Sequence, residues 1–244
     1  TRRSSDLQKS GFVQFWTAMM GLPTLYFSGD MTPYEATSRL VSINTQMTTD
    51  AIDDLAKEKG GIQGMSSDLV VGSNIDFVSR SPITFDSIGR ECQAYVEQHN
   101  AFPSIIVVDN LMDVRVDGMD GEYQEQREVM NNLTKLSRST GSTVIVTHHA
   151  REIDDSAPDV PPSRNSLKNK VTEKPQLILG VSLYGGGVPD SRGQVMPPKF
   201  RVVALKQRQG RSDPSGQDWV QLAAFPEYTW FGPDKMEEPW KEFL

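Results

Sequence analysis

Segments with apolar residues at helical spacing alternate along this chain with short, continuous apolar runs. The first segment predicts an amphipathic helix over about residues 5–20, with Phe12, Phe15, Trp16 and Met19 on its apolar face. An apolar strand is expected next, at 24–28. A second helix then begins at Thr32-Pro33, because Thr32 can cap it, Pro33 suits the first helical position and Glu35 stands at the third.

The middle of the chain repeats this alternation with stronger signals. Ser104–Asp109 is a β-branched run, which is typical of a strand buried on both faces of a parallel sheet. Further strands are expected at 75–79 and 143–147, and helices at about 85–100 and 121–138. The last strands, at about 176–183, 199–206 and 218–224, are separated by turns and predict antiparallel pairing. The pattern predicts an α/β fold whose mostly parallel sheet is flanked by helices and has antiparallel strands at one edge.

The length of 244 residues suits one large α/β domain. We expect a core over residues 1–225 and a tail over 226–244 that contains Trp230, Trp240 and Phe243. Residues 152–175 are polar and rich in Pro, Ser and Lys, which predicts a long loop with a use of its own. The chain starts at Thr1, which is compatible with a fragment of a longer protein.

A net charge of −7 argues against a protein that coats nucleic acid through general positive charge, although local basic loops remain compatible with it. A single cysteine, Cys92, excludes an internal disulfide framework and fits a reducing, cytoplasmic location. No run approaches the roughly 18 apolar residues that a membrane helix needs.

The run Ile105–Asp109 followed by Asn110 fits a Walker-B strand, whose terminal carboxylate holds a magnesium-bound water at the carboxyl edge of the sheet. Any buried parallel strand that ends in an Asp turn has the same pattern. The neighbouring motifs must therefore decide between the two interpretations.

Those motifs resemble the DnaB-like (superfamily 4) replicative helicase motor domain. The stretch from Leu25 to Met31, followed by Arg39-Leu40, is similar to that family's strand ending in Ser-x-Glu-Met with Arg-Leu on the next helix. Val108–Met112 is similar to its Val-Ile-Asp-Tyr-Leu. Further matches, in the same order as in the family, are Pro82–Ile88, Gln124–Leu136, Thr143–Arg151 and Lys206–Gly210. The resemblance covers roughly residues 12–225.

The resemblance implies a RecA-like P-loop NTPase core and an ATP-dependent DNA helicase or DNA-remodelling ATPase. Such a protein acts as an oligomer on single-stranded DNA in replication or recombination, with replication or recombination proteins as partners and with ATP and Mg²⁺ as cofactors. Asp109 would hold the metal-bound water. Asp30, where the family has Glu, would orient the attacking water. His148, where the family has Gln, would sense the γ-phosphate, and Lys206 and Arg208 would reach a neighbouring subunit's nucleotide.

The family's phosphate-binding loop, Gly-x-x-x-x-Gly-Lys-Ser/Thr, does not occur in this sequence. At the expected place stands Thr1–Asp6, where Arg3, Ser4 and Ser5 are the candidate nucleotide-binding residues. Either the glycine-rich part precedes Thr1, or the loop has been lost together with ordinary ATP binding.

Nucleic-acid contacts are expected from the polar loop, through Arg164, Lys168, Lys170 and Lys174, although a solvated loop fits the same composition. The region 113–122 carries four carboxylates against Arg115 and is a poor partner for phosphates. His148 and His149 could suggest a metal pair, but adjacent residues of a strand point to opposite faces, so an ordinary hydrogen-bonding role is favoured.

Two other classes of function stay open. One is a RecA-fold accessory protein that binds DNA or a replication partner without hydrolysing ATP. The other is a metal-dependent nuclease in which Asp30 and Asp109 hold the metal.

Overall fold

The chain divides into two compact units, and each is described by itself. Unit 1 comprises Thr1–Phe15 and His149–Leu244, and unit 2 comprises Trp16–His148. The computed structural model describes residues 4–61, 73–116, 118, 121–150, 160–167, 171–185 and 198–234, with side chains from residue 9 onward.

Unit 2 is built on a parallel sheet of four strands in the order β2 (Ile75–Ser79), β1 (Thr24–Ser28), β4 (Ile105–Asp109), β6 (Thr143–Val146). Every residue of the central strands β1 and β4 is buried. Strands covered on both faces need apolar residues at nearly every position, which explains the uninterrupted runs in the sequence. The predicted parallel sheet is therefore confirmed.

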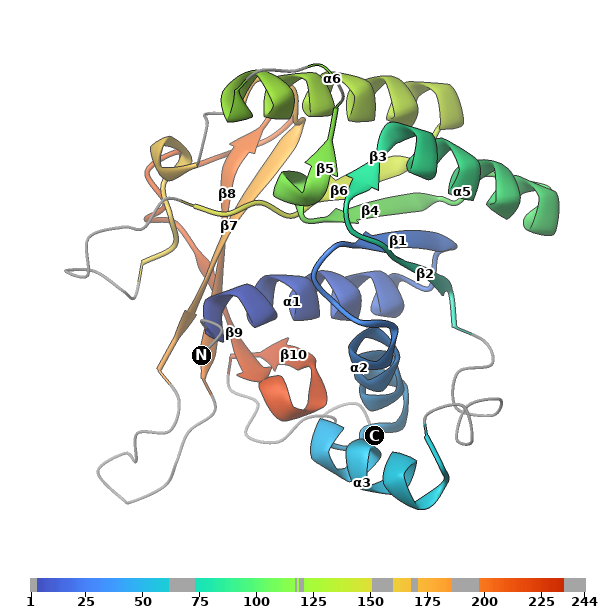
Figure 1. Ribbon diagram of the computed structural model, residues 1–244. Helices are drawn as coiled ribbons and strands as arrows, with labels where there is room; N and C mark the ends of the chain where they lie inside the picture. The colour runs from blue at the N-terminus through green and yellow to red at the C-terminus, as the bar shows by residue number, and fades with distance from the viewer. Residues whose placement is uncertain are drawn as a thin grey trace, which may run out of the picture. The chain divides into compact units, whose positions relative to one another are not determined.

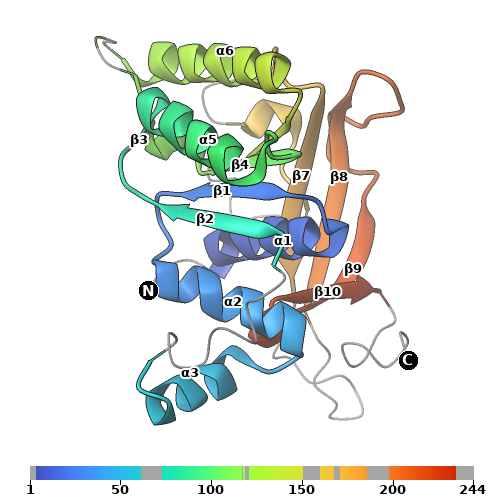
Figure 2. The same ribbon diagram turned by 90° about the vertical axis from the view of Figure 1, so that its right-hand side faces the viewer.

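Helices cover both faces of this sheet. α5 (Phe85–His99) and α6 (Glu122–Thr140) lie over one face, and α2 (Pro33–Thr45) and α3 (Thr49–Glu58) lie on the other side (Figures 1 and 2). The predicted N-cap at Thr32 is confirmed, since its side chain accepts a hydrogen bond from the Glu35 backbone, and Thr84 caps α5 in the same way through the Ser87 backbone. α3 was not predicted.

Three short elements lie beyond the carboxyl ends of these strands. β3 (Ile83–Thr84) pairs in parallel with β5 (Val114–Arg115), and the 3₁₀ turn η1 (Leu111–Asp113) connects β4 to β5. Ile83, Leu111 and Val114 are buried, so these elements are packed against the unit rather than projecting from it. They fix the path of the chain directly after Asp109.

Unit 1 contains an antiparallel sheet in the order β10 (Trp230–Pro233), β9 (Val220–Phe225), β8 (Lys199–Gln207), β7 (Leu177–Tyr184). The antiparallel strands were predicted, but they form a hydrogen-bonded sheet of their own rather than the edge of the parallel one. β10 also lies within the segment 226–244 that was expected to be a tail.

An aromatic cluster holds the antiparallel sheet to the first part of α1 (Ser4–Met20). The Phe12 ring lies 4.7 Å from that of Phe200 and 5.2 Å from that of Phe231, and Phe15 lies 5.0 Å from Trp230 between ring centroids. Such pairs add about 0.5–1.5 kcal/mol each beyond their buried area. Phe12 and Phe15, expected on the apolar face of the first helix, pack against this cluster, whereas Met19, expected on the same face, is 49% exposed.

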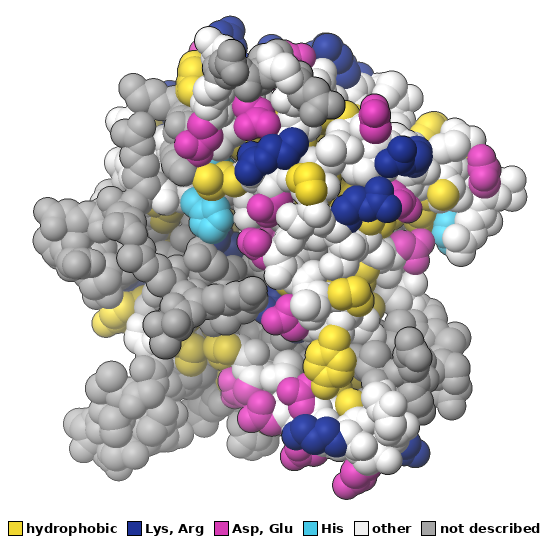
Figure 3. Space-filling model, viewed as in Figure 1, with side chains coloured by type: hydrophobic (Ala, Val, Ile, Leu, Met, Phe, Trp, Pro, Cys, Tyr) yellow, Lys and Arg dark blue, Asp and Glu magenta, His cyan; other side chains and the backbone are white. Residues whose placement is uncertain are grey.

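On the face of unit 2 drawn in Figure 3, acidic and basic side chains are interspersed over α5 and α6. That mixture agrees with the negative net charge and differs from the continuous basic stripe that general nucleic-acid coating needs. Among the helices of the described residues, none combines the length and the apolar character that a bilayer crossing requires.

Candidate functional site

Polar side chains from three neighbouring strands meet at the carboxyl edge of the parallel sheet. The register pairs Ser28, the last residue of β1, with Asp109, the last residue of β4. It also pairs Val108 with Val146, so Thr147 directly follows β6 beside Asp109. Because parallel strands present their carboxyl ends at one edge, residues far apart in sequence become neighbours there.

Asp109 is buried, with 5% of its surface exposed, and both of its carboxylate oxygens accept hydrogen bonds. The Tyr26 hydroxyl donates to Oδ2 over 2.9 Å, and the Thr147 hydroxyl donates to Oδ1 over 2.5 Å. Burial raises the pKa of Tyr26, and the Asp109 charge raises it further, so this hydroxyl keeps its proton. The two donors replace part of the water that a buried carboxylate loses.

Asp30 lies beside this buried carboxylate but in a different environment. It is exposed in the turn after β1, and its Oδ2 accepts a 3.0 Å hydrogen bond from Nδ2 of Asn110. A cis peptide bond joins Asn110 to Asp109. Asp30 and Asp109, each of which was expected to follow a strand, thus lie at the same edge of the sheet, while their catalytic roles remain predictions.

A third carboxylate, Asp113, completes the acidic edge. Its Oδ2 accepts a 3.2 Å hydrogen bond from the backbone N–H of Asn110. Burial raises the pKa of Asp113, the Asn110 N–H opposes this rise, and the nearby charges of Asp30 and Asp109 add to it. The charges of the three carboxylates therefore act on one small region, which is a place where a cation is favoured.

Gly29 allows this close approach. A Cβ atom built at Gly29 would lie 2.7 Å from Cβ, Cγ and Oδ2 of Asp113, and the Gly29 N–H donates to the Asp109 carbonyl over 2.9 Å. Any larger residue would push the 3₁₀ turn away from β1. The glycine in Ser-Gly-Asp is thus a requirement of packing.

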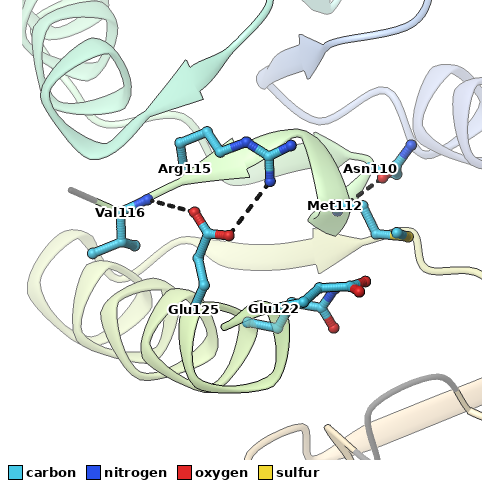
Figure 4. A network of polar contacts seen from close by, with 7 residues as sticks. Asn110, Met112, Arg115, Val116, Glu122 and Glu125 are labelled. Atoms are coloured by element: carbon cyan, nitrogen blue, oxygen red, sulfur yellow. Dashed lines mark hydrogen bonds and ion pairs between the residues drawn. The ribbon is translucent and has the colours of Figure 1, made fainter. Parts of the chain in front are cut away.

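The chain after η1 is fastened to the first turn of α6 (Figure 4). Glu125 accepts a hydrogen bond from the Val116 backbone N–H over 3.1 Å, and its other oxygen lies 3.5 Å from Nη1 of Arg115. The Asn110 side chain accepts from the Met112 N–H over 2.8 Å. Arg115, the cation of the region 113–122, is thereby paired with a carboxylate.

His148 directly follows Thr147 and is partly buried. His149 belongs to unit 1, where its Nδ1 lies 3.0 Å from the Lys9 ammonium group. A ring nitrogen that faces an ammonium group is unsuited to bind a metal ion. The geometry at His149 therefore agrees with the hydrogen-bonding interpretation of this pair.

Among the residues that the structure describes, no group of three or more His, Cys, Asp or Glu side chains could hold a metal ion by itself. Mg²⁺ usually takes one or two protein carboxylates and completes its shell with water and substrate phosphates, so a site here would have to rest on one or two of these side chains. A carboxylate has about four lone-pair positions, so Asp109 retains acceptor capacity beside its two hydroxyl donors.

The other predicted residues divide into three groups. Lys206 and Arg208, at the end of β8, belong to unit 1, as do Arg164 in the turn η2 (Arg164–Ser166) and the exposed Lys174. Ser4 and Ser5 open α1, but their side chains lie outside the described residues. Arg3, Lys168 and Lys170 also lie outside the described residues.

Tyr26, Thr147 and Asn110 were not predicted to be parts of this site. A signal was present for two of them. Once the strands are aligned by their carboxyl ends, Thr147 falls opposite Asp109. Tyr26 lies two residues before Ser28, the register partner of Asp109, and therefore on the same face of the sheet as Ser28. A tyrosine inside an otherwise apolar buried strand needs a hydrogen-bond partner, and Asp109 is within its reach.

Comparison with solved structures supports the same fold. The chain superimposes on a DnaB-like replicative helicase, whose structure was described with its interactions with primase, with a TM-score of 0.73 and 18% identity. That match covers 95% of this chain, which spans 57% of the helicase chain. It also superimposes on the ATPase domain of a second protein, with a TM-score of 0.71, 16% identity and coverage of 95% and 82%. The fold is therefore the RecA-like fold of these domains.

No protein-family model matches the chain. Two curated proteins do. The Gene 65 protein of Mycobacterium phage L5 is 31% identical over 216 residues, which cover 88% of this chain and 77% of that protein. The Gene 65 protein of Mycobacterium phage D29 is 30% identical over 218 residues, which cover 88% and 89%. With this identity over most of both sequences, the chain belongs to the family of mycobacteriophage Gene 65 proteins.

Proposed function

We propose that this chain is the motor core of an ATP-dependent DNA helicase or DNA-remodelling ATPase that works as an oligomer on single-stranded DNA. The RecA-like fold, which it shares with a replicative helicase and an ATPase domain, supports the class of function. The observation that carries the proposal is the acidic edge formed by Asp30, Asp109 and Asp113 at the carboxyl ends of adjacent parallel strands. Ligands of open α/β sheets bind at this edge.

Within this proposal, Asp109 is the residue that would hold Mg²⁺ through a bound water, and Arg3, Ser4 and Ser5 would contact the nucleotide. When bound, Mg²⁺ supplies positive charge that offsets the charge on the phosphate oxygens. Tyr26 and Thr147 hold the Asp109 carboxylate in one orientation. A carboxylate that is already oriented needs no rearrangement during the reaction.

Asp30 would act as the residue that orients the attacking water. It is exposed at the edge, which gives it access to solvent, and the Asn110 amide limits its rotation. His148, which follows the Asp109 donor Thr147 by one position, would respond to the γ-phosphate. The path from Asp109 to His148 consists of this single hydroxyl contact and one peptide bond.

Lys206 and Arg208 would contact the nucleotide of a neighbouring subunit, so an oligomer is part of the proposal. Lys168, Lys170 and Lys174 would contact DNA phosphates. Such contacts depend on salt and not on base sequence. By analogy with the helicase that was described with primase, other replication proteins are the expected partners.

ATP turnover and strand displacement by the full-length protein test this proposal. We expect turnover that rises on addition of single-stranded DNA, and a stimulation that falls between about 50 and 200 mM salt, because phosphate contacts release counterions. An absence of turnover at every salt concentration, with and without DNA, would contradict the proposal.

A non-hydrolysing accessory protein is a second candidate, favoured by two observations. The sequence contains no Gly-x-x-x-x-Gly-Lys-Ser/Thr motif, and both Asp109 oxygens already accept hydrogen bonds from protein hydroxyls. This candidate predicts DNA binding that weakens after removal of Lys168 and Lys170, without nucleotide affinity. Calorimetric titration with ATP separates the two, since tight binding excludes the accessory protein.

A further inference from the structure

The segment 160–167 is fitted closely onto the antiparallel sheet and its neighbouring turn. A Cβ atom at Gly180 would lie 3.0 Å from the Pro162 carbonyl oxygen and 2.9 Å from the Leu205 side chain. A Cβ atom at Gly216 would lie 2.9 Å from the Pro161 carbonyl oxygen. Two glycines on different elements thus allow the backbone of this segment to approach, which fixes its position in unit 1.

Arg164 lies in this same segment. Its backbone N–H donates to the Pro214 carbonyl over 2.9 Å, and it begins the 3₁₀ turn η2. The turn that contains Pro214 is itself attached to β8, because the Asp213 N–H donates to the Ala204 carbonyl over 2.8 Å. These backbone contacts fix the position of the Arg164 Cα atom, and they do not depend on the charge of the Arg164 side chain.

Lys206 and Arg208 extend from the end of β8 toward one short stretch of backbone. The Lys206 ammonium donates to the carbonyls of Thr172 and Glu173 over 2.6 and 3.0 Å. Nη2 of Arg208 donates to the same Glu173 carbonyl over 3.2 Å. Two cationic groups that share one acceptor are close together, and both retain further N–H donors.

The charge of Arg164 also acts at this place. Burial lowers the pKa of Lys206, and the positive charges of Arg208 and then Arg164 lower it further, while Glu173 opposes them weakly. Within the described part of the chain, none of the three cations forms an ion pair with a carboxylate.

Two other cations among the described residues of unit 1 are paired with carboxylates. Arg211 pairs with Asp218 over 3.2 Å, and Lys199 pairs with Asp234 over 3.0 Å. Arg201 lies over the rings of Tyr184 and Trp219. Lys206 and Arg208 share one acceptor, the charge of Arg164 acts on Lys206, and none of the three is ion-paired with a described carboxylate, which together favours binding of an anion.

We infer that Arg164, Lys206 and Arg208 form one site for the phosphate groups of a nucleoside triphosphate, with Arg164 as its third cation. This inference rests on the proposed function, in which only Lys206 and Arg208 reach a neighbour's nucleotide. It moves Arg164 from the predicted DNA-binding loop to the triphosphate site. The planar guanidinium groups of Arg164 and Arg208 can each bind phosphate oxygens through two parallel N–H bonds. The shared carbonyl of Glu173 gathers the cations at one point, which suits a compact polyphosphate better than an extended strand.

Titration of the full-length protein with inorganic tripolyphosphate tests the site without turnover. We expect Arg164→Gln to weaken tripolyphosphate binding about tenfold, because a charge-assisted hydrogen bond is lost, and Arg164→Lys to weaken it less. Arg211→Gln is the matched control, since Arg211 lies on the following turn and is paired with Asp218. Unchanged binding by Arg164→Gln, or an equal loss in Arg211→Gln, would overturn the inference.

A second titration, with an unlabelled single-stranded oligonucleotide, separates the nucleotide from DNA as the source of phosphate. Arg164→Gln should alter oligonucleotide binding less than tripolyphosphate binding, and the reverse order overturns the inference. Hydrolysis of ATP by the same variants distinguishes a failure of the proposed function from a failure of the inference about Arg164. A protein that does not hydrolyse ATP but binds tripolyphosphate through Arg164 contradicts the proposed function alone. A protein that hydrolyses ATP but binds tripolyphosphate equally well without Arg164 contradicts the inference alone.

Discussion

The Tyr26 hydroxyl donates a 2.9 Å hydrogen bond to Oδ2 of the buried Asp109 carboxylate. Tyr26→Phe removes this donor and leaves a buried carboxylate oxygen without its partner. We expect the free energy of unfolding to fall by about 1–3 kcal/mol, because an unsatisfied buried acceptor loses its solvation without compensation. Urea denaturation followed by circular dichroism measures the change.

Tyr95→Phe is the control for this substitution. Tyr95 is also buried in unit 2, but its hydroxyl forms no hydrogen bond with the described residues. Its removal should change the free energy of unfolding by less than about 0.5 kcal/mol. Equal losses of unfolding free energy in Tyr26→Phe and Tyr95→Phe would mean that the hydrogen bond from Tyr26 to Asp109 does not stabilise the fold.

Gly29→Ala should disturb the acidic edge through packing alone. The added Cβ atom would lie 2.7 Å from the Asp113 side chain, so η1 or β1 must move. Overpacking of this kind typically costs about 1–3 kcal/mol. Thermal unfolding of Gly29→Ala should therefore begin at a lower temperature than that of the wild type.

The matched glycine is Gly89, which lies exposed within α5, and a Cβ atom added there would meet no other atom within 4 Å. Gly89→Ala should leave stability unchanged or raise it by up to about 1 kcal/mol, since alanine favours helix. If Gly89→Ala and Gly29→Ala destabilise the protein equally, the close approach of Gly29 to Asp113 does not explain the loss of stability in Gly29→Ala.

The Asp213 turn should make unit 1 sensitive to acid. Its carboxylate accepts hydrogen bonds from the Ser215 hydroxyl and from the backbone N–H groups of Ser215, Gln217 and Asp218. These bonds hold the pKa of Asp213 well below its ordinary value. A lowered folded-state pKa contributes stability that is complete above the unfolded pKa of about 3.9 and is lost as the pH falls below it.

Asp213→Asn removes this titration. Between pH 5 and roughly 3 the unfolding free energy of the wild type should fall more steeply than that of Asp213→Asn, because of the linkage of protonation to unfolding. Parallel pH profiles in urea denaturation would show that the turn does not contribute.

Asp30→Asn separates the catalytic role from the structural one. Because Asp30 is exposed, the substitution should leave the unfolding free energy within about 0.5 kcal/mol of the wild type. Loss of a group that positions the attacking water should lower kcat about 10²-fold or more, with KM little changed. Asp86→Asn, at another exposed aspartate, is the control. A wild-type kcat in Asp30→Asn would remove Asp30 from the mechanism.

The sequence predicted the parallel sheet well because its signals are local. Buried parallel strands must be apolar at nearly every position, as β4 is before its terminal Asp109, and the caps at Thr32 and Thr84 lie within four residues of their partners. α3 was overlooked although its sequence carries a signal, because Ile52, Leu55 and Ala56 repeat at helical spacing and Thr48 caps the helix.

Features that depend on tertiary contacts were not predictable in the same way. β10 is a short strand in a segment rich in Pro and Glu, and its existence depends on pairing with β9. The roles of Tyr26 and Thr147 require the register of three strands, and the Arg164 position requires backbone contacts to residues about 50 positions away. Hydrophobic pattern carries no information about such pairs.

The most direct test of the account is the rate of ATP hydrolysis by the wild-type protein and by Asp109→Asn, each with single-stranded DNA. Asp109→Asn keeps the size of the side chain while it removes the charge at the carboxyl edge of the sheet. We predict DNA-stimulated hydrolysis by the wild type and a rate at least about 10²-fold lower in the variant. Equal rates in the two proteins, or no hydrolysis by the wild type, would contradict the assignment of this edge as the site of ATP chemistry.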